Sequence, residues 1–424
     1  MTDHGFRLTS GDRVLVVAPH PDDETLATGG LLQHAAAAGA GVRVLFVTDG
    51  ENNPWPQRVL EHRWRIEASA RRRWGARRRA EAVAALTALN VAPSRAVFLG
   101  LPDQGLTELL LTRPEQAIAL VAAEIGGWDP TVVVAPSLRD RHPDHSALAV
   151  LTRLALAQLG SDPRRVLVVH YLVHLPRAFG RVEAVRDRPF HVRLSEDEKR
   201  RKRAAIRRHA TQLLFHRRSF TRVAERTERF LPLGDPVALD PTHPIRYAAV
   251  RGHTVALELA SPRMSHLLGS TVVVLTVAAT PRTAPDALPW AIESRGDGDR
   301  TRSSGIRVAA FRAPLRFNRD VVVPVGREQE LAGVFVKLER RPLTFFDDGW
   351  REIPLPAPER ATAIVRAPSA SADRRTHSVC AGRAPHTTAD AGTPTRQTAD
   401  AHGALAVERT DPFRRGTGRP CRAC

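Results

Sequence analysis

The stretch Arg13–Glu24, RVLVVAPHPDDE, joins a short apolar run to a dense group of polar side chains. The run Val14–Val17 shows no polar alternation, which is typical of a strand buried on both faces of a parallel sheet. One imidazole and three carboxylates follow it directly: His20, Asp22, Asp23 and Glu24. Carboxylates this close repel one another, and a protein that gathers them at the end of a buried strand commonly neutralises them with a cation.

A second stretch has the same design. The apolar run Thr131–Ala135, TVVVA, is followed by Arg139–His145, RDRHPDH, which supplies Asp140, His142, Asp144 and His145. Either cluster alone is equally consistent with a helix cap or a turn. Two matched clusters at two strand ends favour a shared metal site, because ligands of open α/β sheets bind beyond the carboxyl ends of the strands.

Strand and helix patterns alternate through the first half of the chain. Apolar runs predict further strands at 42–47, 96–101 and 166–172, and helical periodicity predicts helices at 24–38, 80–90, 117–125 and 144–159. This order predicts a Rossmann-like, mostly parallel sheet with helices on both faces. We expect 52–74 to form a long active-site loop or irregular helix, and 196–213 to form one basic helix.

The pattern of apolar and polar residues changes at two points along the chain. We expect an α/β domain at 1–240, and the short strand-like runs separated by turns at 251–358 predict a β-rich, sandwich-like accessory domain. The segment 367–424 is rich in Ala, Thr, Arg, Pro and Gly and lacks apolar periodicity. It cannot bury enough surface to offset the entropy of ordering, so we expect a disordered tail.

Cysteine usage limits the chemistry. All three cysteines, Cys380, Cys421 and Cys424, lie near the C-terminus, so the α/β region has no thiol for a metal site or a nucleophile. The lone CxxC at 421–424 is half of a zinc site, and we interpret it as two incidental thiols. A site of imidazole and carboxylate suits Zn²⁺, or another divalent ion such as Fe²⁺.

The net charge of +18 invites a nucleic-acid interpretation, which the composition opposes. Only three of the 63 Lys and Arg residues are lysines, a skew that indicates mutational bias in a GC-rich coding sequence. The chain has only two Tyr for base stacking, so we expect no nucleic-acid partner. No apolar run approaches the ~20 residues that cross a bilayer, and the start lacks a signal-peptide core. We therefore expect a cytoplasmic protein, and its oligomeric state is left open.

The two clusters hold the parts for metal-assisted hydrolysis. Two His and one Asp leave an open coordination position for water, whose pKa falls to about 7 on a catalytic zinc ion. A spare carboxylate beside the ligands is a natural general base, and a spare His is a natural acid or oxyanion stabiliser.

The hexapeptide PHPDDE at 19–24 and the pentapeptide RHPDH at 141–145 resemble the signatures of the LmbE-like, or PIG-L, family of zinc-dependent N-acetylglucosaminyl deacetylases. Supporting matches run in the same order: TDGE at 48–51, LGLPD at 99–103 and HATQ at 209–212. The resemblance covers roughly residues 10–235 and leaves the rest of the chain unexplained.

The resemblance implies a role for each matched residue. Its zinc ligands would be His20, Asp23 and His145. Asp22 would be the general base, and His142 would stabilise the oxyanion or assist the leaving amine. Asp144 would orient a histidine, and Arg78 and Asp103 would meet the sugar and its substituents. The implied substrate is a small N-acetylated amino-sugar conjugate, from which acetate leaves.

Two alternatives remain open. One is an amidase of another N-acyl small molecule, such as a thiol or natural-product conjugate. The other is a non-catalytic sugar- or polyanion-binding protein with a vestigial metal site. Asp22 and His142 argue against the binding protein, which needs neither a base nor a spare imidazole.

Overall fold

The computed structural model describes residues 7–160, 165–174, 190–232, 243–259, 271–278, 300–301, 306–312, 319–324, 331–339 and 345–355. The predicted tail, 367–424, lies outside these ranges. The predicted division into domains at 1–240 and 251–358 stays a prediction.

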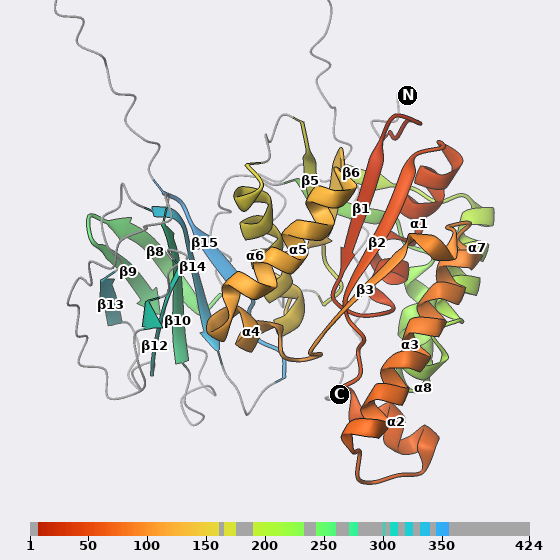
Figure 1. Cartoon of the computed structure of the whole chain (residues 1–424), viewed down its shortest axis with the longest axis horizontal. Coiled ribbons are helices and arrows are strands. Elements are labelled where there is room, and N and C mark those ends of the chain that lie inside the picture. Colours follow the sequence, from red (N-terminus) through yellow and green to blue (C-terminus); the bar gives the residue numbers. More distant parts are fainter. Residues whose placement is uncertain are drawn as a thin grey trace, which may run out of the picture. The chain divides into compact units, whose positions relative to one another are not determined.

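A seven-stranded sheet organises the first part of the chain, in the order β3-β2-β1-β4-β5-β7-β6. The first five strands in this order run parallel, and β7 returns antiparallel to β5 (Figure 1). The strands are β1 (Arg13–Ala18), β2 (Gly41–Thr48), β3 (Ala96–Leu101), β4 (Val132–Pro136), β5 (Leu167–Tyr171), β6 (Phe190–Val192) and β7 (Glu228–Pro232). The mostly parallel α/β fold predicted from the sequence is thereby confirmed.

Helices cover both faces of this sheet. Val14 and Val16 of β1 share a core with α1 (Asp23–Ala37), α3 (Ala68–Ala88) and α7 (Glu196–Ile206). Leu15 and Val17, one residue out of phase, face α4 (Leu106–Thr112), α5 (Pro114–Trp128) and α6 (Pro143–Gln158). Successive side chains of a strand point to opposite faces, so β1 needs apolar residues at every position.

The strand order places the two polar loops together. β1 pairs with β2 on one side and with β4 on the other, so the chain leaves β1 in one direction along the sheet and later returns to its other side. The loops after β1 and β4 therefore turn to opposite faces and leave a crevice between them, where ligands of such sheets bind.

One helical prediction holds only in part and another was wrong. The segment 52–74, predicted as a loop or irregular helix, contains a regular helix, α2 (Pro54–Glu61), and the first part of α3. α2 is only eight residues long and buries only Pro56 and Gln57. The predicted single helix 196–213 is two, α7 and α8 (Ala210–Val223), with a break before His209. Two further elements, α4 and η1 (Pro93–Arg95), have no counterpart among the helices predicted from the sequence.

The later strands form two antiparallel sheets, in the orders β11-β12-β10-β14-β15 and β13-β9-β8. Apolar side chains of both sheets share one core, as in a sandwich. The strands are β8 (Ile245–Arg251), β9 (Thr254–Leu259), β10 (Thr271–Ala278), β11 (Arg300–Thr301), β12 (Ile306–Arg312), β13 (Arg319–Pro324), β14 (Leu331–Glu339) and β15 (Trp350–Ile353).

The segment before β15 packs on the loop that follows β4. The backbone N–H of Asp347 donates to the carbonyl of Arg141 at 3.0 Å, and that of Trp350 donates to Leu138 at 2.8 Å. Gly349 has a φ of +77°, and a Cβ there would lie 2.3 Å from the Leu138 carbonyl oxygen. Only glycine permits this approach, so the contact is built into the chain.

None of the described helices combines the length and the apolar character that a membrane span requires.

Candidate metal and catalytic site

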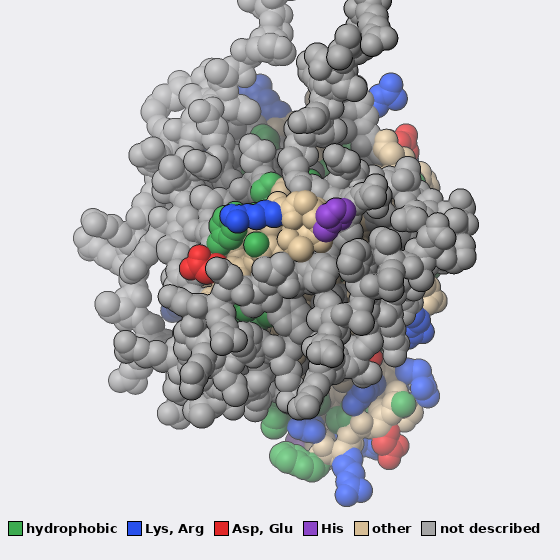
Figure 2. Space-filling model, turned by 90° about the vertical axis from the view of Figure 1, so that its left-hand side faces the viewer, with side chains coloured by type: hydrophobic (Ala, Val, Ile, Leu, Met, Phe, Trp, Pro, Cys, Tyr) green, Lys and Arg blue, Asp and Glu red, His purple; other side chains and the backbone are tan. Residues whose placement is uncertain are grey.

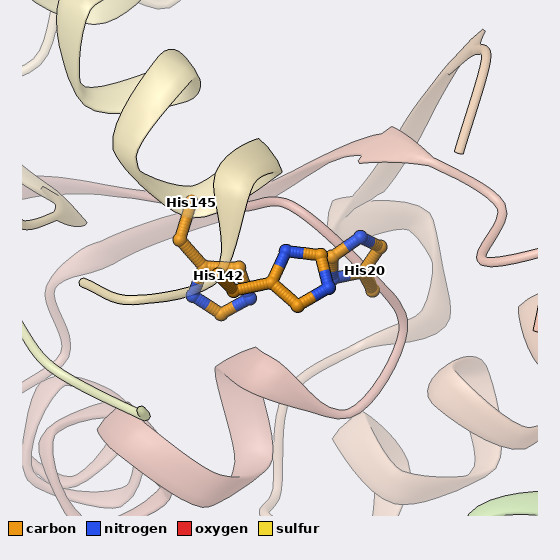
Figure 3. Close-up of side chains that lie close together, drawn as sticks. All are labelled: His20, His142 and His145. Carbon is orange, nitrogen blue, oxygen red and sulfur yellow. The ribbon is translucent and has the colours of Figure 1, made fainter. Parts of the chain in front are cut away.

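Three buried histidines meet where the loops after β1 and β4 face each other (Figure 3). His20 follows β1, and His142 and His145 begin α6. Ring centroids lie 4.7 Å apart for His20 and His142, 4.8 Å for His142 and His145, and 5.3 Å for His20 and His145. One nitrogen of each ring lies within 4.8 Å of the others, which is close enough for one ion to be shared.

Asp23 lies between two of these rings. Its Oδ2 atom is 3.1 Å from Nδ1 of His20 and 3.1 Å from Nε2 of His145. Nε2 of His145 is fully buried, and within the described part of the chain its contact with Asp23 is an ion pair that lacks hydrogen-bond geometry. A buried nitrogen without a hydrogen-bond partner, next to a carboxylate and a second imidazole, is the donor arrangement of a metal site.

Outer carboxylates set which nitrogen of each ring faces the centre. Nδ1 of His145 is 3.2 Å from Oδ2 of Asp140, so a ring proton sits there and Nε2 is the nitrogen that faces Asp23. Nε2 of His20 is 3.1 Å from Asp103 and 3.3 Å from Asp144, which leaves Nδ1 for the centre. Burial would lower the pKa of both rings, but Asp140 and Asp23 raise the pKa of His145 to about 10, and Asp103, Asp144 and Asp23 raise that of His20 well above its usual value. A cation bound beside Asp23 would therefore take the place of a proton on each ring.

His142 has the opposite arrangement. Its Nδ1 accepts a hydrogen bond from the backbone N–H of Asp144 at 3.2 Å, at the N-terminus of α6. Burial, together with the imidazoles of His20 and His145, holds the pKa of His142 well below its usual value. The ring is neutral, and its proton is on Nε2. His142 can therefore donate a hydrogen bond from Nε2, whereas the other two rings turn their inner nitrogens toward Asp23.

The adjacent carboxylates of Asp22 and Asp23 differ in basicity. Burial raises the pKa of Asp22 to about 6, although Arg78, with Nη2 3.4 Å from Oδ1, opposes the rise. Burial would also raise the pKa of Asp23, but the imidazoles of His145 and His20 outweigh it and hold that pKa well below its usual value. Because their environments drive the two pKa values apart, Asp22 can accept a proton near neutral pH, whereas Asp23 stays an anion.

The backbone at Asp22 is unusual, with a φ of +136° in a residue that is not glycine. Its N–H donates to Oε2 of Glu24 at 2.9 Å, and Oε1 of Glu24 is 3.2 Å from Nε2 of His209. The late HATQ motif thus supports the PHPDDE turn through Glu24. Strain of this kind persists only where surrounding contacts over-determine the conformation.

Arg78 and Asp103 both contact residues of the centre. Arg78 is buried, and its terminal nitrogens donate to the carbonyls of Gly50 and Pro21 at 2.8 and 2.7 Å. Asp103 accepts from the N–H of Asn52 at 2.7 Å and reaches His20. Their predicted contacts with the sugar stay predictions.

Asp140 and His174 belong to the site, although the sequence analysis assigned neither a role. Asp140 accepts from the N–H groups of His142 and Val173 at 2.9 Å, and Oδ1 is 3.2 Å from Nδ1 of His174. Burial would raise the pKa of Asp140, but His145 and His174 outweigh it and hold that pKa well below its usual value. The signal for His174 was its place directly after β5, a third parallel strand end.

Two aromatic rings from the segment before β15 lie against the histidines. The Phe345 ring centroid is 4.8 Å from that of His142, and the Phe346 centroid is 5.2 Å from that of His174. Phe345 remains 38% exposed, so its ring also presents a face to solvent beside the site. Local sequence patterns carry no sign of this contact, which joins residues about 200 positions apart.

Comparisons with known proteins agree on this region. Residues 15–156 match the PIG-L family, described as GlcNAc-PI de-N-acetylase. A 1D-myo-inositol 2-acetamido-2-deoxy-alpha-D-glucopyranoside deacetylase of Mycolicibacterium smegmatis is 33% identical over 162 residues, which are 34% of this chain and 53% of the relative. The protein of that name from Rhodococcus erythropolis is 33% identical over 161 residues, 35% of this chain and 53% of the relative. The chain thus spans about half the length of these relatives.

Solved structures also resemble the chain. A conserved protein of Thermus thermophilus is 26% identical, with 55% of this chain and 99% of that protein covered at a TM-score of 0.39. N,N'-diacetylchitobiose deacetylase of Pyrococcus horikoshii is 20% identical, with 52% and 84% covered at a TM-score of 0.40. The expected resemblance to the PIG-L, or LmbE-like, family is thus confirmed for residues 15–156 of this chain.

Proposed function

We propose that this protein is a metal-dependent hydrolase that removes an acetyl group from the amine of an N-acetylglucosamine-type small molecule. The observation that carries the proposal is the convergence of Nδ1 of His20, Oδ2 of Asp23 and Nε2 of His145, with contacts of 3.1 Å on both sides of the carboxylate. The names of the matched relatives, deacetylases of a 2-acetamido sugar on inositol, support the reaction and the substrate class.

His20, Asp23 and His145 would hold the ion, and their mixed imidazole and carboxylate donors fit Zn²⁺ first and Fe²⁺ second. A divalent ion bound there would act as a Lewis acid toward the amide carbonyl and lower the pKa of water. Asp140 behind His145 and Asp144 behind His20 are positioning residues, because each accepts the proton of a ligand ring and keeps the other nitrogen turned inward.

Asp22 would carry the proton through the reaction. Its carboxylate accepts a proton from water as the oxygen forms a bond to the amide carbon. The same proton then passes to the nitrogen as the carbon–nitrogen bond breaks, so acetate and a free amine leave. A pKa of about 6 suits both halves of this role near neutral pH.

His142 would stabilise the charge that develops on the amide oxygen. Its neutral ring carries the Nε2 proton because Nδ1 already accepts from the backbone of Asp144. A donor fixed in this way, inside a buried site, stabilises a developing oxyanion at little reorganisation cost.

The test combines metal analysis with an amine-release assay. The purified chain is expected to hold stoichiometric divalent metal and to release free amine from N-acetylglucosaminyl-inositol. Asp22→Asn should keep the metal and lose about 10²- to 10⁴-fold in kcat, the usual contribution of a general base. His145→Ala should lose the metal. Asp197→Asn, an exposed carboxylate change on α7, is the matched control and should leave both unchanged.

Each hypothesis has its own refuting outcome. Absence of bound metal would overturn the hydrolase, and wild-type turnover in Asp22→Asn would overturn the base assignment. If the protein released amine from N-acyl thiol conjugates and from no amino sugar, the substrate would be a thiol conjugate and not an N-acetylglucosamine-type molecule. Tight sugar binding by a metal-loaded protein without turnover would favour a binding protein.

A further inference from the structure

Exposed apolar side chains gather on two neighbouring elements away from the site. Of the eleven large hydrophobic side chains recorded as exposed in the described residues, six lie on α2, on the loop after it or on α8. They are Trp55, Val59, Leu60, Trp64, Leu214 and Phe215. α2 packs against α8, and α2 with the start of α3 extends away from the sheet (Figure 1). We call these six side chains the α2–α8 patch.

The two indoles of the patch are held in their exposed positions. The guanidinium of Arg58 lies 4.8 Å from the Trp55 ring and 5.1 Å from the Trp64 ring. Its Nε donates to the Trp64 carbonyl at 3.0 Å, and the two rings are 6.4 Å apart. Trp55 is nevertheless 51% exposed and Trp64 75% exposed. Exposed tryptophans that are positioned by specific contacts indicate a surface built to meet something.

Basic residues surround the patch. Exposed arginines lie on the loop after α2, on the first turns of α3 and on α8: Arg63, Arg65, Arg71, Arg72, Arg73, Arg217, Arg218 and Arg222. The α2–α3 segment between Pro54 and Arg73 holds two glutamates, Glu61 and Glu67. Figure 2 shows apolar and basic side chains side by side at the lower end of the molecule, which α2 forms. The charge of this surface complements an anionic partner.

We propose that the α2–α8 patch docks on an anionic phospholipid surface. Indoles favour the boundary between headgroups and hydrocarbon, and arginines beside them favour anionic headgroups. Val59, Leu60 and Leu214 separate this partner from a nucleic acid, which would also attract arginines and stack on tryptophans but gives aliphatic side chains nothing to bury against.

The position of the patch connects membrane docking to the site. α2 begins two residues after Asn52, whose N–H donates to the carboxylate of Asp103 in the site. α3 begins beside the patch and carries Arg78, which contacts Asp22. Docking would therefore hold the site close to a lipid surface. The inference itself does not rest on the proposed function, because docking is measured without substrate.

The test is co-sedimentation of the full chain with vesicles. Vesicles of phosphatidylglycerol and phosphatidylcholine in equal parts should bind the wild-type chain, and vesicles of phosphatidylcholine alone should bind it at least roughly tenfold more weakly. Trp55→Ser with Trp64→Ser should weaken binding to the anionic vesicles roughly tenfold or more. Arg63→Gln with Arg65→Gln should weaken it roughly 25-fold, at about fivefold for each charge. Leu120→Ser is the control, because Leu120 lies on α5, outside the patch, and is 39% exposed, close to the 37% of Leu60 and the 40% of Leu214. It should leave binding unchanged.

The same variants separate this inference from the deacetylase proposal. Trp55→Ser with Trp64→Ser should keep wild-type turnover of a soluble N-acetylated sugar, since neither ring contacts the site. Failure of the wild-type chain to bind anionic vesicles would overturn the docking proposal, as would equal binding to both vesicle types. Binding by the double tryptophan variant at wild-type strength would also overturn it. If single-stranded DNA of matched charge displaced the bound vesicles, and the chain bound this DNA more tightly than the vesicles, the patch would be a nucleic-acid site instead.

Discussion

Asp140→Asn gives the sharpest test of how the metal site is built. Oδ1 of Asp140 accepts from His142 N–H at 2.9 Å and lies 3.2 Å from Nδ1 of His174. Oδ2 accepts from the N–H groups of Val173 and His174 at 2.9 and 3.2 Å and lies 3.2 Å from Nδ1 of His145. An asparagine must place its NH₂ group at one of these positions, where two or three donors lose their acceptor.

The magnitude follows from this count. A hydrogen bond to a charged group contributes about 1.5–3 kcal/mol, so the loss of two lowers the free energy of unfolding by about 3 kcal/mol or more. His145 also loses the anion that keeps its proton on Nδ1. Removal of such an outer carboxylate commonly weakens metal affinity about 10- to 100-fold.

The assay is competition for Zn²⁺ against a chromophoric chelator, with unfolding in urea measured on the metal-free chain. Asp12→Asn is the matched control, because Asp12 also accepts a backbone N–H, from Thr9 at 2.7 Å, but lies away from the site. It should leave Zn²⁺ affinity unchanged. If Asp140→Asn bound Zn²⁺ within about twofold of wild type, less than a typical outer-carboxylate effect, the positioning role of Asp140 would be wrong.

Three further predictions follow from other contacts. Burial lowers the pKa of His170 to about 3, below the ~6.5 of an unfolded histidine, so the stability it contributes is complete above pH 6.5 and lost as pH falls toward 3. From pH 7 to pH 5, the free energy of unfolding in urea should fall by about 2 kcal/mol more for the wild-type chain than for His170→Asn. An equal fall in the two proteins would contradict this prediction. Phe345→Ala should raise KM severalfold and spare kcat, because its exposed ring lies beside His142; an unchanged KM would exclude contact with substrate. Lys337→Ala leaves Asp347 buried without its partner at 2.7 Å and should cost about 3–5 kcal/mol, which Lys337→Ala with Asp347→Ala should partly restore.

Much of the α/β fold could be predicted from local patterns. The strand Val14–Val17 lies within β1, which is buried on both faces there and so has no polar position to interrupt the apolar run. The runs at 42–47 and 96–101 also lie within observed strands, although β2 carries Arg43 and β3 is only partly buried. The helices at 144–159 and 117–125 were recognisable because one face of each packs on the sheet.

The failures have a common cause. α2 spans only eight residues and leaves its apolar side chains Trp55, Val59 and Leu60 exposed, so no core-facing stripe marks it as a helix. The break between α7 and α8 occurs where His209 reaches Glu24 from a different part of the chain. The position of α2 and the break before α8 both depend on contacts with residues that are distant in the sequence, and a local pattern does not contain such contacts.

The sequence by itself determined which side chains the candidate site contains. PHPDDE and RHPDH contain the imidazoles and carboxylates, and the apolar runs before them require that each group stand at the end of a buried strand. Which nitrogen of each ring faces the centre was decided only by the tertiary structure, since Asp140, Asp144 and Asp103 reach those rings across the sheet. The placement of Phe345 beside His142 was also decided there, because it needs Gly349 to approach a loop more than 200 residues earlier. A residue's type is a local property, whereas its proton, its charge and its neighbours depend on what the fold brings against it.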